Sequence, residues 1–165
     1  LQGIADMDAR YDAAAAQVEV LAKLFNQRGC KYGLYNHGSW GGEPQTMVEV
    51  VKRVEANDVG IVYNFFHGHD QLDLMPEAFA AMLPHLMCVN LNGMNPQGPK
   101  ILPLGSGVRD RQILQMIADS DYGGPIGLID HRPEIDAEIS LRENLAGMQA
   151  VLQDIGDKDA LATYH

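Results

Sequence analysis

Short apolar runs alternate along this chain with stretches of helical periodicity. The apolar runs predict four strands, at about residues 31–36, 59–63, 87–92 and 126–129. Apolar residues three or four positions apart predict helices at about residues 6–27, 44–55, 77–83, 110–117 and 136–155. Strands that alternate with helices are typical of α/β proteins with a parallel sheet.

Each predicted strand ends on polar residues that can bind a ligand. The carboxyl ends of parallel strands meet at one edge of a sheet, where α/β folds place their sites. This edge is therefore the predicted active face. The residues on it are Asn36 and His37 after the first strand, Asn64, His67, His69 and Asp70 after the second, Asn90 and Asn92 in the third, and Asp130, His131 and Arg132 after the fourth.

One interval between strands carries an insertion, residues 93–107, which is rich in Gly, Pro, Asn and Gln. Long loops inside compact α/β domains are uncommon and are often functional. Lys100 lies in this loop, where it either reaches a substrate oxygen or remains an exposed lysine.

Length and charge limit the functions that the chain can have. A chain of 165 residues is expected to make one domain with a sizeable core. The net charge of −10 disfavours nucleic acid and anionic membranes as partners, because both require an excess of Lys and Arg. No apolar stretch approaches the roughly 18 residues of a membrane span. The acidic composition favours a cytoplasmic protein.

Two stretches of the second half resemble a known family. These are Leu104-Gly105-Ser106-Gly107-Val108-Arg109-Asp110 and Asp121-Tyr122-Gly123-Gly124-Pro125 with the strand that runs to Asp130. They resemble the closing βα units of the xylose isomerase-like TIM barrels, the sugar phosphate isomerase/epimerase family. Asn64-Phe65-Phe66-His67 is similar to the family's Asp-x-x-His, and Gly33 to Gly38 is similar to its strand that ends in Glu.

The resemblance implies a fold of parallel βα repeats of the (β/α)8 TIM-barrel type, with this chain covering about the last four βα units. Residues 1–156 would form the C-terminal half of the barrel domain, and residues 157–165 a polar tail. Four strands cannot close a barrel of eight. The chain is therefore either an open four-stranded sheet or half a barrel that requires a missing N-terminal half or a second copy.

The resemblance also implies a metal site, from which this chain departs. Family enzymes hold a divalent metal with two Glu, one Asp and one His. The two Glu positions correspond to Asn36 (or Tyr35) and Asp130. The Asp position corresponds to Asn64, and the His position to Asn90. Amides do not compensate the charge of a hard cation. A metal is therefore expected to bind weakly, through His67, Asp130 and His37, and to be Mn, Co or Zn rather than Mg.

We therefore expect a sugar isomerase/epimerase-like enzyme that moves a proton next to a carbonyl, with or without a metal, on a small-molecule sugar. The catalytic candidates are His67, Asp130 and His37, and the substrate-binding candidates are Asn36, Trp40, Asn64, Asn90, Asn92 and Lys100. The alternative is a non-catalytic carbohydrate-binding member of the same fold, in which amides have replaced the metal site. A flavodoxin-like regulatory domain lacks support, because no acidic cluster or phosphate loop follows the first strand.

Several candidates also have a structural interpretation. His37 and His67 either form a site or hydrogen-bond nearby backbone at strand ends. Asp130 either works as acid or base, or belongs to a closed network of ion pairs with Arg132. Trp40 either stacks on a sugar or packs under its own loop.

Overall fold

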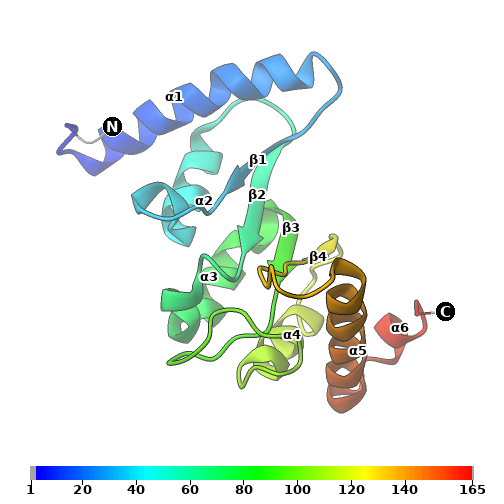
Figure 1. The fold of residues 1–165 in the computed structure, drawn as a ribbon. Coiled ribbons are helices and arrows are strands. Elements are labelled where there is room, and N and C mark those ends of the chain that lie inside the picture. Colours follow the sequence, from blue (N-terminus) through cyan, green and yellow to red (C-terminus); the bar gives the residue numbers. More distant parts are fainter. Residues whose placement is uncertain (1–2, 165) are drawn as a thin grey trace. The chain divides into compact units, whose positions relative to one another are not determined.

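The computed structural model describes residues 3–164; residues 1, 2 and 165 lie outside the described part. Its strands are β1 (Tyr32–Tyr35), β2 (Val59–Asn64), β3 (Leu86–Leu91) and β4 (Ile126–Leu128), and they form one sheet in the order β1-β2-β3-β4 (Figure 1). The pairs β1–β2 and β3–β4 are parallel. The predicted fold class is confirmed.

Helices alternate with the strands, close to the predicted bounds. They are α1 (Met7–Asn26), α2 (Pro44–Arg53), α3 (Met75–Met82), α4 (Asp110–Ala118), α5 (Ala137–Ile155) and the short α6 (Lys158–Leu161). Short 3₁₀ helices lie at η1 (Trp40–Gly42), η2 (His69–Leu74) and η3 (Leu83–His85). In the part of the chain that is described, no helix is long and apolar enough to cross a membrane.

The chain divides into two compact units, which we describe separately. Unit 1 comprises Leu1–Tyr63 and Leu74–Cys88, and unit 2 comprises Asn64–Asp73 and Val89–His165.

Unit 1 contains β1, most of β2, and helices α1, α2 and α3. Asp6 caps α1 by accepting a hydrogen bond from the Ala9 amide, and Gly29 follows the helix with a φ of 69°. Helix α2 starts at Pro44 and packs on both α1 and α3. The core of unit 1 includes Ala14, Ala15, Ala22, Met47, Val48, Val50, Val51, Ile61, Tyr63, Met75, Phe79 and Met82.

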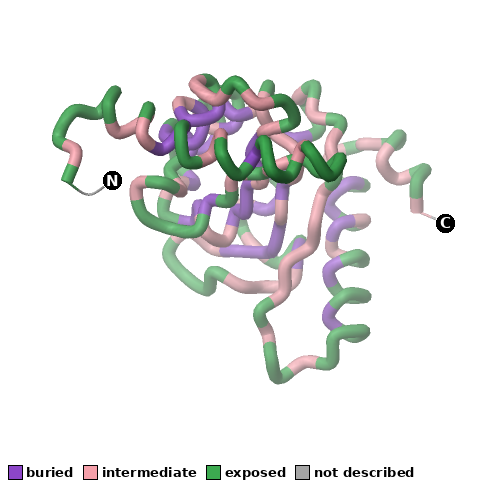
Figure 2. Tube along the Cα trace, turned by 90° about the horizontal axis from the view of Figure 1, so that it is seen from above, coloured by how far each residue is buried: buried purple, intermediate pink, exposed green. Residues whose placement is uncertain are grey.

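Unit 2 contains β4, the second half of β3, and helices α4, α5 and α6. Helix α5 starts where the Asp136 side chain accepts hydrogen bonds from the amides of Glu138 and Ile139, and ends at Gly156 with a φ of 78°. Its buried residues lie on one flank, which Figure 2 shows in purple. The core of this unit consists of Phe65, Val89, Leu91, Met94, Leu104, Ile113, Leu114, Ile117, Met148, Val151 and Leu152.

The predicted polar tail contains a helix. Asp157 caps α6 by accepting a hydrogen bond from the Ala160 amide. A helix of four residues leaves no periodic pattern long enough to recognise in the sequence.

Candidate functional site

The carboxyl ends of β2, β3 and β4 come together within unit 2. The Phe65 amide, one residue after β2, donates to the carbonyl oxygen of Asn90 in β3 at 3.0 Å. The Ile129 amide, one residue after β4, donates to the carbonyl oxygen of Leu91 at 2.8 Å. The polar residues that follow these three strands therefore share one edge, as their positions in the sequence predicted.

Two histidines at this edge contact the same aromatic ring. The centroid of the Phe66 ring lies 5.1 Å from that of the His67 imidazole and 5.4 Å from that of the His131 imidazole. His67 follows β2 and His131 follows β4, so side chains distant in sequence meet here. His131 was not among the predicted catalytic residues. Its place directly after Asp130 was the only signal for it in the sequence.

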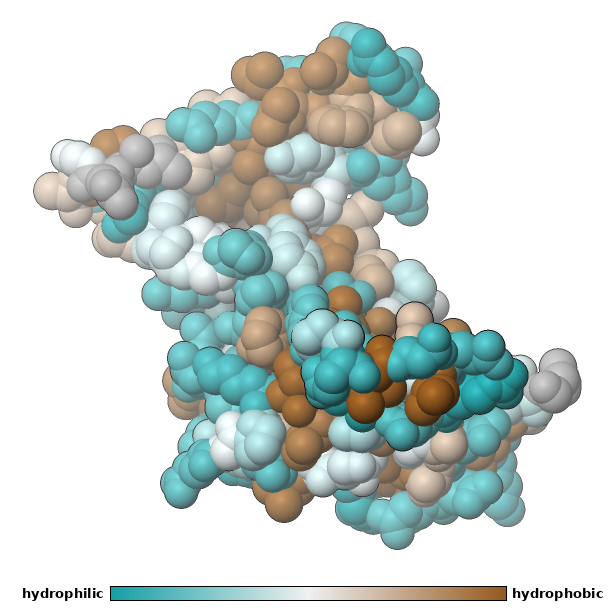
Figure 3. Space-filling view, viewed as in Figure 1, coloured by the Kyte–Doolittle hydropathy of each residue, from teal (hydrophilic) through white to brown (hydrophobic). Residues whose placement is uncertain are grey.

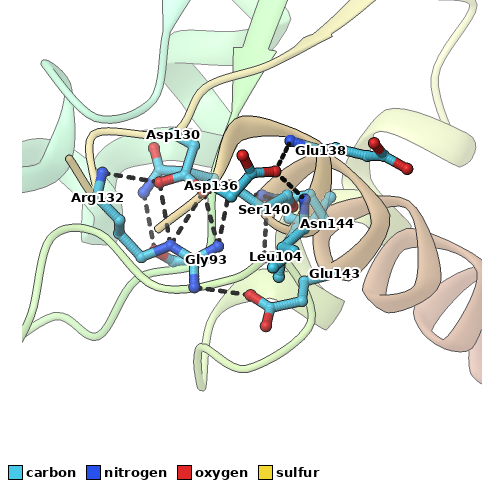
Figure 4. Close-up of polar contacts among 11 residues, drawn as sticks. Gly93, Leu104, Asp130, Arg132, Asp136, Glu138, Ser140, Glu143 and Asn144 are labelled. Carbon is cyan, nitrogen blue, oxygen red and sulfur yellow. Dashed lines mark hydrogen bonds and ion pairs between the residues drawn. The ribbon is translucent and has the colours of Figure 1, made fainter. Parts of the chain in front are cut away.

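Asp130 forms a closed ion pair with Arg132. The Arg132 Nε donates to both carboxylate oxygens at 3.0 Å, and its Nη2 donates to Asp130 Oδ2 at 2.7 Å. Arg132 Nη1 donates to Glu143 Oε2 at 2.9 Å, so the guanidinium lies between two carboxylates (Figure 4). The Arg132 guanidinium holds the pKa of Asp130 below its ordinary value. Asp130 therefore remains an anion at neutral pH.

The buried side chain of Asn144 connects this pair to two other segments. Its Oδ1 accepts from the Leu104 amide at 2.8 Å, and its Nδ2 donates to the Ser140 carbonyl oxygen at 2.9 Å and to Asp130 Oδ2 at 3.3 Å (Figure 4). Asn144 lies one helical turn after Ser140, in a helix that reads only as amphipathic. No pattern in the sequence indicates this role for Asn144.

The cavity beside the ion pair has a volume of about 530 Å³. It lies between β4 and α5, and Asp130 and Arg132 line it together with Leu128, Ser140 and Asn144. A cavity of this size is typical of small-molecule sites.

The amides at the strand ends have different surroundings. Buried Asn64 accepts a hydrogen bond from the Phe66 amide at 3.0 Å, which makes the turn that leads to His67. Asn90 packs over β4 at Gly127, where an added Cβ would lie 2.2 Å from the Asn90 side-chain oxygen. Buried Asn92 donates through Nδ2 to the carbonyl oxygens of Gly93 and Lys100. Asn64 and Asn92 therefore shape the loops of this edge.

The long loop after β3 is fixed to the segment that follows β2. Gly93 and Leu102 pair as an antiparallel bridge, which makes the loop a short hairpin. Buried His69 lies 2.8 Å through Nε2 from the Asn95 carbonyl oxygen, so that Nε2 carries the proton. The Lys100 ammonium pairs with Asp70 Oδ1 at 3.2 Å. Lys100 therefore contacts a neighbouring loop in this structure.

Asp110 is the last residue of the stretch 105–110, which has the pattern Gly-x-Gly-x-x-Asp, and its side chain holds this loop together. Its carboxylate, 1% exposed, accepts hydrogen bonds from the amides of Met94, Gly105 and Gly107. The motif is thus a loop folded around an acidic side chain at the start of α4.

The remaining candidates belong to unit 1. Asn36 is buried, and His37 is exposed with its ring centroid 6.5 Å from that of Tyr35. Trp40 packs on the core of α1, with the Arg10 guanidinium 4.0 Å from its ring centroid and the Tyr11 ring at 5.5 Å. Trp40 therefore packs against α1 in this structure.

The described residues do not fit a resident divalent cation. Among them, no three side chains of His, Cys, Asp or Glu are grouped so that they could hold a metal ion. The carboxylate of Asp130 is already neutralised by Arg132. We therefore assign no metal to this site.

The sequence as a whole matches one protein family. The model of the xylose isomerase-like TIM barrel family covers residues 2–151, and the chain belongs to this family. The resemblance seen in the sequence is thereby confirmed. No curated protein matches the sequence significantly.

Solved structures with the same fold include sugar epimerases, an epimerase-like protein and a probable dehydratase. A D-tagatose 3-epimerase-like protein superposes with a TM-score of 0.68 at 18% identity, over 92% of this chain and 58% of its own. The D-psicose 3-epimerase of Clostridium cellulolyticum H10 gives a TM-score of 0.61 at 17% identity, over 91% and 58%. The 3-keto-D-glucoside 4-epimerase of E. coli gives 0.63 at 15%, over 90% and 55%. This chain therefore spans little more than half the length of these proteins.

Proposed function

We propose that this chain belongs to a sugar isomerase or epimerase that moves a proton on the carbon next to a carbonyl. The observation that carries the proposal is the meeting of His67 and His131 around Phe66, at the carboxyl ends of β2 and β4. The sugar epimerases among the solved structures of this fold support the substrate class.

His67 is the proposed general base. Histidine is the side chain whose ordinary pKa lies nearest neutrality, so it can both take and return a proton. His67 would take the proton from the carbon next to the carbonyl, and the electron pair of that bond would form the enolate. Return of this proton to the neighbouring carbon on the same face, with transfer of the hydroxyl proton to the enolate oxygen, gives the isomer. The epimer requires a second acid that protonates the enolate carbon from the opposite face, while His67 releases its proton to solvent. His131 would donate a hydrogen bond to the enolate oxygen.

We propose that Asp130 positions Arg132 and does not act as the base. Its carboxylate already accepts three hydrogen bonds from the Arg132 side chain, and its pKa is lowered by that guanidinium. It is therefore a poor proton acceptor at neutral pH. We propose that it holds Arg132 in place at the wall of the cavity and that Asn90 is a ligand for sugar hydroxyls.

The test is isotope exchange in the natural polypeptide that contains these 165 residues. It is incubated in D2O with a panel of keto and aldo sugars that includes D-tagatose, and NMR detects deuterium on the carbon next to the carbonyl. His67→Ala should abolish exchange, and His131→Ala should slow it by about 10²-fold or more. His85→Ala is the matched control, because His85 lies in unit 1 at the amino end of β3.

Two further arms decide the role of metal and of Asp130. Exchange is measured with EDTA and with added Mn, Co or Zn, alongside the metal content of the purified protein. If the protein contains stoichiometric metal and EDTA abolishes exchange, then the proposal that His67 and His131 act without a metal is contradicted. Asp130→Asn should impair binding of the sugar and leave the pH profile of exchange in place, whereas a base at Asp130 would change that profile.

The second candidate is a carbohydrate-binding protein without catalysis. The closed Asp130–Arg132 pair favours it, because a neutralised carboxylate binds hydroxyls but does not move protons. Saturable binding of a sugar by calorimetry, with no exchange under any condition, would establish this reading and overturn the first.

A further inference from the structure

The N-terminal half of α5 leaves apolar side chains exposed beside the cavity of about 530 Å³. The exposed fractions of Ile139, Leu141 and Leu145 are 54%, 51% and 37%. Figure 3 shows apolar side chains (brown) among hydrophilic ones (teal) over this part of the helix. Of the three residues, Leu141 lines the cavity. An exposed aliphatic side chain at the wall of a cavity favours an apolar occupant.

The cavity has an apolar side that extends beyond Leu141. Five of the ten residues that line it are apolar, and they come from the end of β4, the loop after it and the start of α5. These residues are Leu128, Pro133, Ile135, Ala137 and Leu141. Their side chains offer a ligand contact area and no hydrogen bond.

The polar side chains of the cavity already form hydrogen bonds with one another (Figure 4). Asp130 Oδ2 accepts from Arg132 Nε and Nη2 and from Asn144 Nδ2. Asn144 Oδ1 accepts from the Leu104 amide, and Ser140 Oγ accepts from Arg132 Nη2 at 3.1 Å. A ligand hydroxyl that is buried against this wall would find few groups able to replace its bonds to water, which is costly.

The charges beside the cavity disfavour an anionic ligand. Arg132 is the single arginine or lysine among the described residues that line it. Its guanidinium pairs with Asp130 at 2.7 Å and with Glu143 at 2.9 Å, so one positive and two negative charges leave a net charge of −1. A phosphate or carboxylate in the cavity would therefore lose its hydration without gaining an unpaired cation from this wall.

We propose that this cavity binds an uncharged, apolar substituent of the sugar derivative on which the protein acts, an alkyl or aryl aglycone. The inference rests on the proposed function, because His131 lines the cavity and also contacts the Phe66 ring that His67 contacts. The sugar ring would lie against the two histidines, and its substituent against Leu141. A volume of about 530 Å³ is in the range of sites that enclose a whole small molecule, so a single methyl group would leave the cavity largely empty.

The experiment measures binding by calorimetry to the natural polypeptide that contains these 165 residues. The probes are the methyl, phenyl and para-carboxyphenyl glycosides of D-glucose, D-galactose and D-mannose. For at least one of these sugars, the phenyl glycoside should bind about ten- to a hundredfold more tightly than the methyl glycoside, because the phenyl ring buries more apolar area. The para-carboxyphenyl glycoside should lose most of this gain, because its carboxylate finds no unpaired cation.

Variants of two exposed residues of α5 test the position of the aryl group. Leu141→Glu should abolish the preference for the phenyl glycoside, and Leu141→Lys should shift it toward the para-carboxyphenyl glycoside. Ile139→Glu and Ile139→Lys are the matched controls, since Ile139 has a similar exposure on the same helix and is not among the residues that line the cavity. They should leave all affinities unchanged. A general loss of stability would not reverse the preference between two ligands.

Two outcomes would overturn the proposal. The first is a panel in which no phenyl glycoside binds more tightly than its methyl counterpart, as is expected if another segment or a partner protein fills the cavity. The second is a preference for phenyl that the Leu141 and Ile139 variants change equally, because the aryl group then binds elsewhere.

Isotope exchange separates this proposal from the proposed function. A preference for the phenyl glycoside that depends on Leu141, with no exchange on any sugar, contradicts the proposed catalysis and leaves the binding site for the substituent in place. Exchange on sugars, with no preference for the phenyl glycoside, contradicts the binding site for the substituent and leaves the proposed catalysis in place.

Discussion

At the scale of single residues, the role of a histidine in this chain depends on the residues that surround it. His67 and His131 share the ring of Phe66, whereas His69 is buried and fastens the long loop through Asn95. The sequence placed both His67 and His69 on the predicted active face and did not separate their roles. It placed His131 on the same face but did not predict its contact with Phe66, because a contact between loops after β2 and β4 depends on packing between distant segments.

The ion pair of Asp130 and Arg132 predicts a pH-dependent contribution to stability. The guanidinium lowers the pKa of Asp130 in the folded state, so the pair stabilises the fold above the ordinary pKa of about 3.9 and loses that effect as the pH falls through the folded value. Asp130→Asn should lower the free energy of unfolding at pH 7 by about 1–3 kcal/mol. The difference from wild type should shrink as the pH is lowered toward 3.

Urea unfolding at a series of pH values measures this effect. Glu138→Gln is the control, since Glu138 pairs with Arg142 on the exposed face of α5 and such pairs contribute little. A difference between Asp130→Asn and wild type that stays constant from pH 7 to pH 3 would show that the carboxylate does not titrate as argued.

At the scale of elements, the sequence was most informative where a local rule operates. Apolar periodicity, Pro44 at the start of α2 and Asp136 at the start of α5 placed the helices within a few residues of their observed bounds. The polar strand ends also predicted which edge carries the candidate site. The long loop was recognised as an insertion, but its attachment through Asn92, Asp110 and Asn144 was not, since each bond joins segments that are distant or of ordinary composition.

Helix α5 crosses the long loop at a single glycine. A Cβ added at Gly147 would lie 1.6 Å from the carbonyl oxygen of Leu104, which is backbone and cannot move aside alone. Helix propensity by itself predicts that Gly→Ala in a helix stabilises by about 1 kcal/mol. We expect the opposite sign for Gly147→Ala, a loss of about 2 kcal/mol or more, because the loop must shift away from α5.

Chemical unfolding of Gly147→Ala decides between packing and propensity. Gly123→Ala is the control, because no atom lies within 4 Å of a Cβ built there. If Gly147→Ala proves more stable than wild type, then the contact between α5 and Leu104 is looser than the structure has it.

At the scale of the whole molecule, charge is the property that the sequence defines without reference to the fold. The chain has 22 acidic and 12 basic side chains, and many of the basic ones form ion pairs with acidic partners. The acidic surplus has no partner among the basic residues and repels itself. A net charge far from zero keeps a protein soluble and also destabilises its compact state.

We therefore expect sodium chloride to stabilise this protein at concentrations where it screens the repulsion among the carboxylates. Between about 0.01 M and 0.15 M salt the Debye length falls from about 30 Å to about 8 Å, so repulsion among separated carboxylates weakens most. Exposed ion pairs also weaken, but each contributes only about 0–1 kcal/mol. The melting temperature should rise with salt in wild type and rise less in Asp121→Lys/Glu134→Lys, since two exposed acidic residues are then reversed in charge. A melting temperature that falls over this range would mean that attraction within ion pairs outweighs the repulsion of the acidic surplus.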